Sequence, residues 1–283
     1  MRPAPTAGEE SLLAVDSLTV DFTARGREPV HAVREVSFTV DRGECVVVLG
    51  ESGSGKSATA RALLGLHDPR STMVTAKELS LAGDSLLGPT SRLADIRGRR
   101  MSMVFQDALS ALNPVYRVGP QIAEMFEAHW KMGRREANEK AVALMRAVQI
   151  PDAERRARSY PHELSGGMRQ RVVIAMALAL EPELVIADEP TTALDVTVQS
   201  QILQLFRELR ANTGMALLLI THDVGVAAEI ADRVVVMKSG SVVESGTVNQ
   251  VLLAPRHPYT VELISSVPRA DASSATRDGA HDG

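Results

Sequence analysis

Residues 45–57 read CVVVLGESGSGKS, and the prediction of the fold begins from this segment. Its first five residues are apolar without a break, which is typical of a strand covered on both faces of a sheet. Residues 50–57 then match the pattern G-x-x-x-x-G-K-[ST], in which glycines let backbone N–H groups converge on phosphate oxygens. A helix rich in Ala and Leu is expected from Ser57 to Leu66, and its N-terminal dipole favours an anion. We expect Lys56 to reach the β- and γ-phosphates of a nucleotide and the Ser57 hydroxyl to bind Mg²⁺.

A second apolar strand ends in two carboxylates. Residues 184–189 read LVIADE. Asp188 is placed to hold Mg²⁺ through water, as in other phosphate-loop NTPases, and Glu189 to polarise an attacking water. Such an acidic strand end is often only a solvated loop, but beside a complete phosphate loop it predicts a site that hydrolyses a nucleotide.

Strands and helices alternate over the rest of the chain. Helical periodicity is found in residues 118–150, after Ser165 and in residues 198–209, and further β-like runs separate these segments. We expect strands at residues 17–22, 36–40, 101–106, 184–187 and 217–220 and a hairpin at 233–243. This order predicts a mainly parallel α/β sheet with a mostly helical insertion.

The composition excludes several classes of protein. The chain has 283 residues and a formal net charge of −4, so a general electrostatic attraction to nucleic acid is not expected. Cys45 is the single cysteine, which excludes disulfides within these residues and favours a reducing compartment. The longest apolar run, residues 172–180, is far shorter than the ~20 residues of a membrane span. If this protein serves a membrane process, other chains are expected to do the spanning.

A third motif carries the resemblance to a known family. Residues 164–171 read LSGGMRQR. Ser165 can cap a helix whose first N–H groups are free, and Gly166 and Gly167 permit the close approach of a phosphate. With this motif the chain resembles the ABC ATPase family over about residues 12–255. The resemblance implies an α/β fold: a phosphate-loop NTPase (RecA-like) core with a small antiparallel β subdomain and a helical subdomain, at about residues 107–165, inserted after the Q-loop.

The resemblance also assigns roles to single residues. It implies that Gln106 is the Q-loop glutamine, that Ala193-Leu194-Asp195 is the D-loop, and that His222 is the switch histidine at the γ-phosphate. Phe22 resembles the aromatic residue that stacks on adenine. The catalytic residues implied in this way are Glu189, His222, Gln106 and Lys56, and the Mg²⁺ ligands are Ser57, Gln106 and Asp188. The implied ATP-binding residues are Phe22, Gly50, Glu51, Ser52, Gly53, Ser54, Gly55, Lys56, Ser57, Ala58, Gln106, Ser165, Gly166, Gly167, Asp195 and His222. Among them, the residues of the signature motif serve the ATP that a partner subunit holds.

Three segments resemble more narrowly the oligopeptide, dipeptide and nickel importer branch of the family. They are VFQDALSALNP at residues 104–114, residues 164–179 as a whole, and PRHPYT at residues 255–260. This implies an ATP-hydrolysing subunit of a dipeptide or oligopeptide importer that uses ATP and Mg²⁺, with nickel or a metal chelate as the alternative cargo. The implied domains are a flexible N-terminus over 1–10, an ABC ATPase domain over 11–255, and a short importer-type extension over 256–283 whose end is disordered.

The resemblance implies partners and a location as well. We expect a second ABC ATPase subunit, a related but different chain in a head-to-tail dimer, two membrane permease subunits and, indirectly, an extracellular substrate-binding protein. The protein would then be peripheral, at the cytoplasmic face of the cell membrane, with residues 113–119 as the candidate contact with a permease. Two other classes stay open, an export ATPase and an ABC ATPase that works on nucleic acid. The sequence HPY at residues 257–259 argues against the first, and the lack of coiled-coil insertions and zinc motifs argues against the second.

Overall fold

The computed structural model describes residues 11–23, 28–192 and 194–266. The predictions of a flexible N-terminus at residues 1–10 and of a disordered end after residue 266 therefore lie outside the described residues, as does Ala193 of the predicted D-loop. Within these ranges no helix combines the length and the apolarity that a crossing of the membrane needs.

The central sheet has six strands in the order β11-β10-β3-β9-β8-β7. Its five pairings are parallel except for the antiparallel hairpin of β10 and β11. Continuous apolar runs predict strands buried on both faces, and every residue of β3, β8 and β9 is buried. The strands are β3 (Cys45–Leu49), β7 (Met101–Val104), β8 (Leu184–Asp188), β9 (Ala216–Thr221), β10 (Arg233–Lys238) and β11 (Ser241–Thr247).

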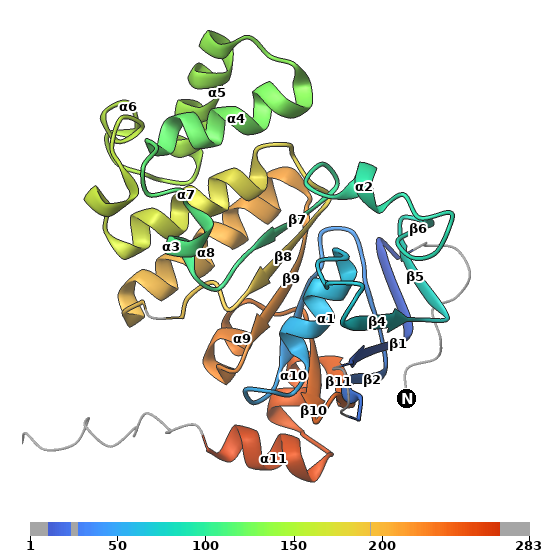
Figure 1. The fold of residues 1–283 in the computed structure, drawn as a ribbon. Helices are drawn as coiled ribbons and strands as arrows, with labels where there is room; N and C mark the ends of the chain where they lie inside the picture. The colour runs from blue at the N-terminus through green and yellow to red at the C-terminus, as the bar shows by residue number, and fades with distance from the viewer. Residues whose placement is uncertain (1–10, 24–27, 193, 267–283) are drawn as a thin grey trace, which may run out of the picture.

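A second, antiparallel sheet lies beside the central one (Figure 1). It contains β1 (Leu13–Phe22), β2 (Val30–Val40), β4 (Thr72–Thr75), β5 (Glu78–Leu81) and β6 (Asp84–Ser85). The first two strands begin earlier than the alternating pattern predicts. The reason is a pair of irregularities: Ser17 and Glu35 have left-handed φ angles of 53° and 48°, and the register of β1 and β2 shifts nearby. Such bulges interrupt the alternation of inward and outward side chains, so the first half of each strand is hidden from the pattern.

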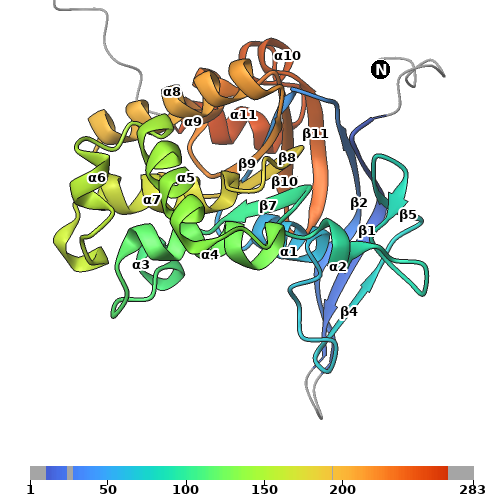
Figure 2. The same cartoon turned by 90° about the horizontal axis from the view of Figure 1, so that it is seen from above.

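Helices cover the central sheet and form a separate block (Figure 2). Helix α1 (Lys56–Leu63) follows β3. The helical block consists of α3 (Ala108–Ala111), α4 (Val118–Trp130), α5 (Arg134–Ala147) and α6 (Ala153–Arg156), and it lies on the side of the central sheet away from the antiparallel sheet. The remaining helices are α2 (Leu93–Ile96), η1 (Pro161–Glu163), α7 (Gly166–Leu178), α8 (Val196–Thr213), α9 (Val224–Ile230), α10 (Val248–Leu253) and α11 (Pro258–Ser265).

The core is divided by the central sheet into two layers. Alternate residues of β3, such as Val47 and Leu49, join one apolar cluster with the helical block, while Val46 and Val48 join a second cluster with the antiparallel sheet. Because the two faces of a strand alternate, each buried strand contributes to both layers. Helix α7 belongs to the first cluster and is apolar nearly all round, which fits a helix packed between the sheet and the helical block.

The topology brings four strand ends together. Strands β3, β9, β8 and β7 are neighbours and run parallel, so their carboxyl ends lie at one edge of the sheet. The segments that leave this edge carry the phosphate loop, His222, Asp188 with Glu189, and Gln106. Predicted site residues from four distant segments of the sequence therefore lie at the same edge of the central sheet, where ligand sites of parallel sheets are usually found.

Candidate active site

The phosphate loop has no room for side chains at two of its glycines. A Cβ atom at Gly50 would collide with the carbonyl oxygen of Met237 on β10, and one at Gly55 would lie 2.5 Å from the carbonyl oxygen of Ala32 on β2. Gly55 also has a left-handed φ of 100°, a conformation that glycine adopts without strain. Gly55 is the N-cap of α1 and supplies no side-chain cap to the helix. The first N–H groups of α1 have no partner within the helix and are suited to an anion.

The side chain of Lys56 folds back over this loop. Its Nζ atom donates to the carbonyl oxygens of Gly50, at 2.7 Å, and Glu51, at 2.8 Å. Only 4% of the residue is exposed, and this burial lowers the pKa of the Lys56 ammonium. The ammonium is thus poised inside the loop, and a polyphosphate would offer it a more favourable anionic partner.

The predicted Mg²⁺ residues of α1 and β8 are in contact. The Ser57 hydroxyl donates to Oδ1 of Asp188 at 2.9 Å. Burial raises the pKa of the Asp188 carboxyl, and the hydrogen bond from Ser57 opposes this shift. A divalent cation beside these oxygens would favour the charged carboxylate, and hydroxyl and carboxylate oxygens are donors that Mg²⁺ accepts.

Glu189 lies at the centre of a hydrogen-bonded group. Nε2 of Gln106 donates to Oε2 of Glu189 at 3.0 Å, and Nδ1 of His222 lies 3.1 Å from Oε1 of Glu189. The hydroxyl of Thr192 also donates to Oε2, at 2.9 Å. The backbone of Glu189 has a left-handed φ of 46°, and its N–H donates to the carbonyl oxygen of Ile220 at the end of β9. The carboxylate is therefore oriented by groups from three neighbouring strand ends.

A cavity of about 530 Å³ joins the phosphate loop to this group. Glu51, Lys56, Ser57, Gln106, Glu189 and His222 are among the residues that line it. The four residues with a predicted catalytic role, Glu189, His222, Gln106 and Lys56, all line this cavity. Two other lining residues were not predicted: Ala32, in β2, and Leu263, in α11 near the end of the described chain.

Phe22 lies at the end of β1, next to α1. The residue is 37% exposed, and its ring meets the ring of His67 edge-on, with 5.4 Å between the ring centroids. Nε2 of His67 in turn lies 2.8 Å from the carbonyl oxygen of Ala58, in the first turn of α1. His67 is not among the site residues predicted from the sequence. The geometry leaves Phe22 close to the start of α1 with part of its ring accessible.

The predicted signature and D-loop residues lie together, away from the cavity of the same chain. Ser165 caps α7 by accepting from the N–H of Met168, and Asp195 caps α8 by accepting from the N–H of Val198. A Cβ atom added at Gly167 would lie 2.7 Å from Val198, so the N-termini of the two helices are in contact. Ser165 and Gly166 are exposed. This surface is available to another molecule.

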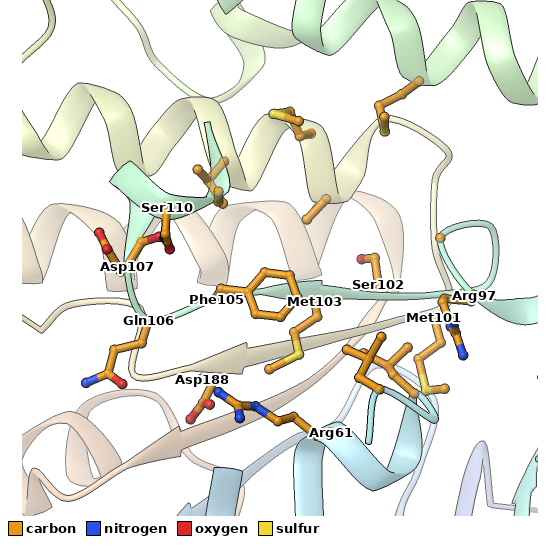
Figure 3. Close-up of a pocket in the computed structure, with 18 of the residues that line it drawn as sticks. Arg61, Arg97, Met101, Ser102, Met103, Phe105, Gln106, Asp107, Ser110 and Asp188 are labelled. Carbon is orange, nitrogen blue, oxygen red and sulfur yellow. Dashed lines mark hydrogen bonds between the residues drawn. The ribbon is translucent and has the colours of Figure 1, made fainter. Parts of the chain in front are cut away.

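A larger cavity, of about 650 Å³, is also lined by Gln106 (Figure 3). Its floor includes Met101, Met103 and Phe105, and Arg61 and Arg97 reach it from α1 and from the turn before β7. Helices α3 and α4 of the helical block, together with α7, close the opposite side. Ser57 and Gln106 belong to both cavities, so a molecule in the larger one would touch residues of the candidate active site.

Sequence families match the chain over most of its length. A family described as ABC transporter matches residues 33–192, and one described as Oligopeptide/dipeptide transporter, C-terminal region, matches residues 243–281. The dipeptide transport ATP-binding protein DppD of Bacillus subtilis is 47% identical over 94% of this chain and 79% of its own length. The oligopeptide transport ATP-binding protein OppD of Bacillus subtilis is 46% identical over 93% of this chain and 73% of its own length.

Solved structures of ATP-binding cassettes share the fold. A dimeric ATP-binding cassette in a post-hydrolysis state, bound to ADP and Pi, superposes with a TM-score of 0.69 at 28% identity and covers 83% of this chain and 98% of that chain. The protein cbiO1 of Clostridium perfringens, part of an ABC transporter complex, superposes with a TM-score of 0.70 at 26% identity, over 87% of this chain and 92% of that chain. The predicted phosphate-loop NTPase fold and the predicted ATPase class are confirmed. The chain belongs to the ABC transporter family of ATP-binding proteins, in its oligopeptide/dipeptide branch.

Proposed function

We propose that this chain is the ATP-hydrolysing subunit of an ABC importer for dipeptides or oligopeptides. The observation that carries the proposal is the cavity in which the phosphate loop faces a Glu189 carboxylate held by Gln106 and His222. The peptide cargo is supported by the relatives that are named for dipeptide and oligopeptide transport and by the match of residues 243–281.

The chemistry follows from the positions of the charges. When ATP enters, the Lys56 ammonium exchanges the carbonyl oxygens of Gly50 and Glu51 for phosphate oxygens, and the N–H groups at the start of α1 bind the same polyphosphate. The Glu189 carboxylate then accepts a hydrogen bond from the attacking water, while His222 contacts the γ-phosphate. Hydrolysis is in this way a matter of positioning and of charge stabilisation.

Mg²⁺ would bind at the contact between Ser57 and Asp188, with Gln106 near by. When bound, it neutralises part of the triphosphate charge. Within the described residues, no group of three or more His, Cys, Asp or Glu side chains could hold a metal ion by itself. Phosphate oxygens and water are therefore expected to complete the coordination, as Mg²⁺ usually requires.

Two copies of the cassette fold would complete each site. Ser165, Gly166 and Gly167 stand at the N-terminus of the 13-residue helix α7 and lie outside the cavity of their own chain. In a head-to-tail dimer this helix end, with Asp195, would meet the ATP held by the phosphate loop of the other subunit. We expect that other subunit to be a related but different ATPase chain. Phe22 would stack on the adenine ring.

The larger cavity is suited to a segment of a membrane permease subunit. It offers a methionine-rich apolar floor with Arg61 and Arg97 at its rim, so an amphipathic segment with an acidic residue would fit it. Residues 113–119 follow directly after α3, which lines the cavity, and Val115 and Tyr116 are 72% and 60% exposed. Two permeases, with an extracellular substrate-binding protein acting through them, would place this subunit at the cytoplasmic face of the membrane.

Replacing Lys56 by Ala tests the phosphate loop. The K56A variant loses the buried ammonium, whose charge-assisted hydrogen bonds contribute on the order of 1.5–3 kcal/mol, so we expect ATP affinity to fall at least about tenfold. Titration with ATP–Mg²⁺, followed by calorimetry, measures the change. K77A, which removes an exposed lysine between β4 and β5, should bind like the wild type. Unchanged affinity of K56A would remove the loop from the proposed role.

Replacing Glu189 by Gln tests the proposed base. The amide keeps the shape of the side chain but loses the charge, so E189Q should bind ATP and hydrolyse it at least about a hundredfold more slowly. Mixed with the partner ATPase and ATP–Mg²⁺, the variant should accumulate as a dimer of subunits in light scattering. The control is E136Q, an exposed change in α5. Normal turnover by E189Q would show that another group activates the water.

Site-specific crosslinking tests the permease contact. A photo-crosslinking amino acid in place of Tyr116 should form an adduct with a permease subunit in the assembled transporter, because Tyr116 is exposed and residues 113–119 follow α3, a helix that lines the larger cavity. The same group in place of Lys77, in the bend between β4 and β5, should form none. If no position from 113 to 119 gives an adduct in an intact transporter, the proposed docking surface is wrong.

A further inference from the structure

Helix α11, near the end of the described chain, reaches back to the phosphate loop. Tyr259 in its first turn is only 3% exposed, and its hydroxyl oxygen accepts a hydrogen bond from the backbone N–H of Glu51 at 3.1 Å. These two residues are 208 positions apart in the sequence. Leu263, one turn further along α11, lines the cavity that contains the loop. The C-terminal element is therefore part of the wall of the candidate active site.

Several contacts fix the position of this tyrosine. Glu244 of β11 accepts hydrogen bonds from the backbone N–H groups of Arg256, at 2.8 Å, and His257, at 3.0 Å. The His257 side chain then caps α11 by accepting from the N–H of Tyr259. The ammonium of Lys238, at the end of β10, lies 4.3 Å from the centre of the tyrosine ring, in cation–π contact. The ring is thus held from the β10–β11 hairpin and from its own helix.

The phosphate loop depends on contacts from outside it, because the hydrogen bonds from Lys56 to its carbonyl oxygens would be lost when ATP binds. In the structure the Lys56 ammonium holds the Gly50 and Glu51 carbonyls from inside. Once this ammonium turns to phosphate, those two hydrogen bonds are given up. Two anchors that come from outside the loop and from α11 or the β10–β11 hairpin stay: the Tyr259 hydroxyl on the Glu51 N–H, and the Gly240 N–H, which donates to the Ser54 carbonyl at 3.0 Å. Glycine-rich backbone without such anchors would lose more conformational entropy on binding a nucleotide.

We propose that Tyr259 is a positioning residue of the nucleotide site, whose hydroxyl holds the Glu51 amide and so keeps the phosphate loop in the shape that ATP binds. The inference rests on the proposed role of the loop in ATP binding. It gives the C-terminal element a task in the ATPase subunit itself, in addition to any task in the assembled transporter. Burial raises the pKa of the Tyr259 phenol, so the hydroxyl stays neutral near neutral pH.

The test is the variant Y259F, which keeps the ring and its contact with Lys238 and removes only the hydroxyl. A net hydrogen bond is worth enough to change an equilibrium about three- to tenfold. We expect the KM for ATP to rise by this factor in steady-state hydrolysis, kcat to stay within about twofold, and the Glu51 amide proton to exchange faster in NMR. The matched control is Y160F, which should change none of the three quantities.

Each outcome decides between the alternatives. A KM and a Glu51 exchange rate equal to those of the wild type would overturn the proposal. A loss of kcat at constant KM, or a lower thermal midpoint without a change in KM, would mean that Tyr259 only stabilises the fold, and this would also overturn it. K56A, measured in parallel, separates a failure of the proposed nucleotide site from a failure of the proposed role of Tyr259. If K56A binds ATP normally, the site itself is misassigned, whereas impaired K56A with normal Y259F contradicts only the role of Tyr259.

Discussion

The structure depends on the close fit between the phosphate loop and the two strands on which it lies. Backbone carbonyls of Met237 in β10 and Ala32 in β2 leave no space for a Cβ atom at Gly50 and Gly55. The loop must therefore be built from glycine at these positions, and its backbone is left to turn its N–H groups towards a ligand. The same fit ties the site to both sheets, since β2 belongs to the antiparallel sheet and β10 to the central one.

The parallel order of the central sheet supplies the rest of the site. Because β3, β9, β8 and β7 are neighbours, a nucleotide on the phosphate loop would face a carboxylate pair, a histidine and a glutamine without any long excursion of the chain. Gln106 lines both cavities. A permease segment in the larger cavity would contact Gln106, which also belongs to the hydrolysis site in the smaller cavity. A movement of that segment would therefore act on the hydrolysis site through this one side chain.

The sequence predicts most of this architecture, because continuous apolar runs and glycine-rich turns have local causes. Short segments of sequence are enough to predict the strands β3, β8 and β9. The same holds for the residues Lys56, Asp188 and Glu189, because each belongs to a motif of consecutive residues. Contacts between distant segments cannot be read in this way. Thr192 on Glu189, His67 between Phe22 and Ala58, and Tyr259 on Glu51 follow no spacing rule, since they exist only after the chain has folded. The early parts of β1 and β2 were hidden because bulges break their alternation.

ATP bound on the phosphate loop should draw the Lys56 ammonium away from the loop carbonyls. A structure of the chain with ATP and Mg²⁺ is the decisive measurement. We expect Nζ of Lys56 to leave the carbonyls of Gly50 and Glu51 for phosphate oxygens, while the Glu51 N–H stays on the Tyr259 hydroxyl and Mg²⁺ lies beside Ser57 and Asp188. A nucleotide bound in the larger cavity, with Lys56 still on the two carbonyls, would contradict it.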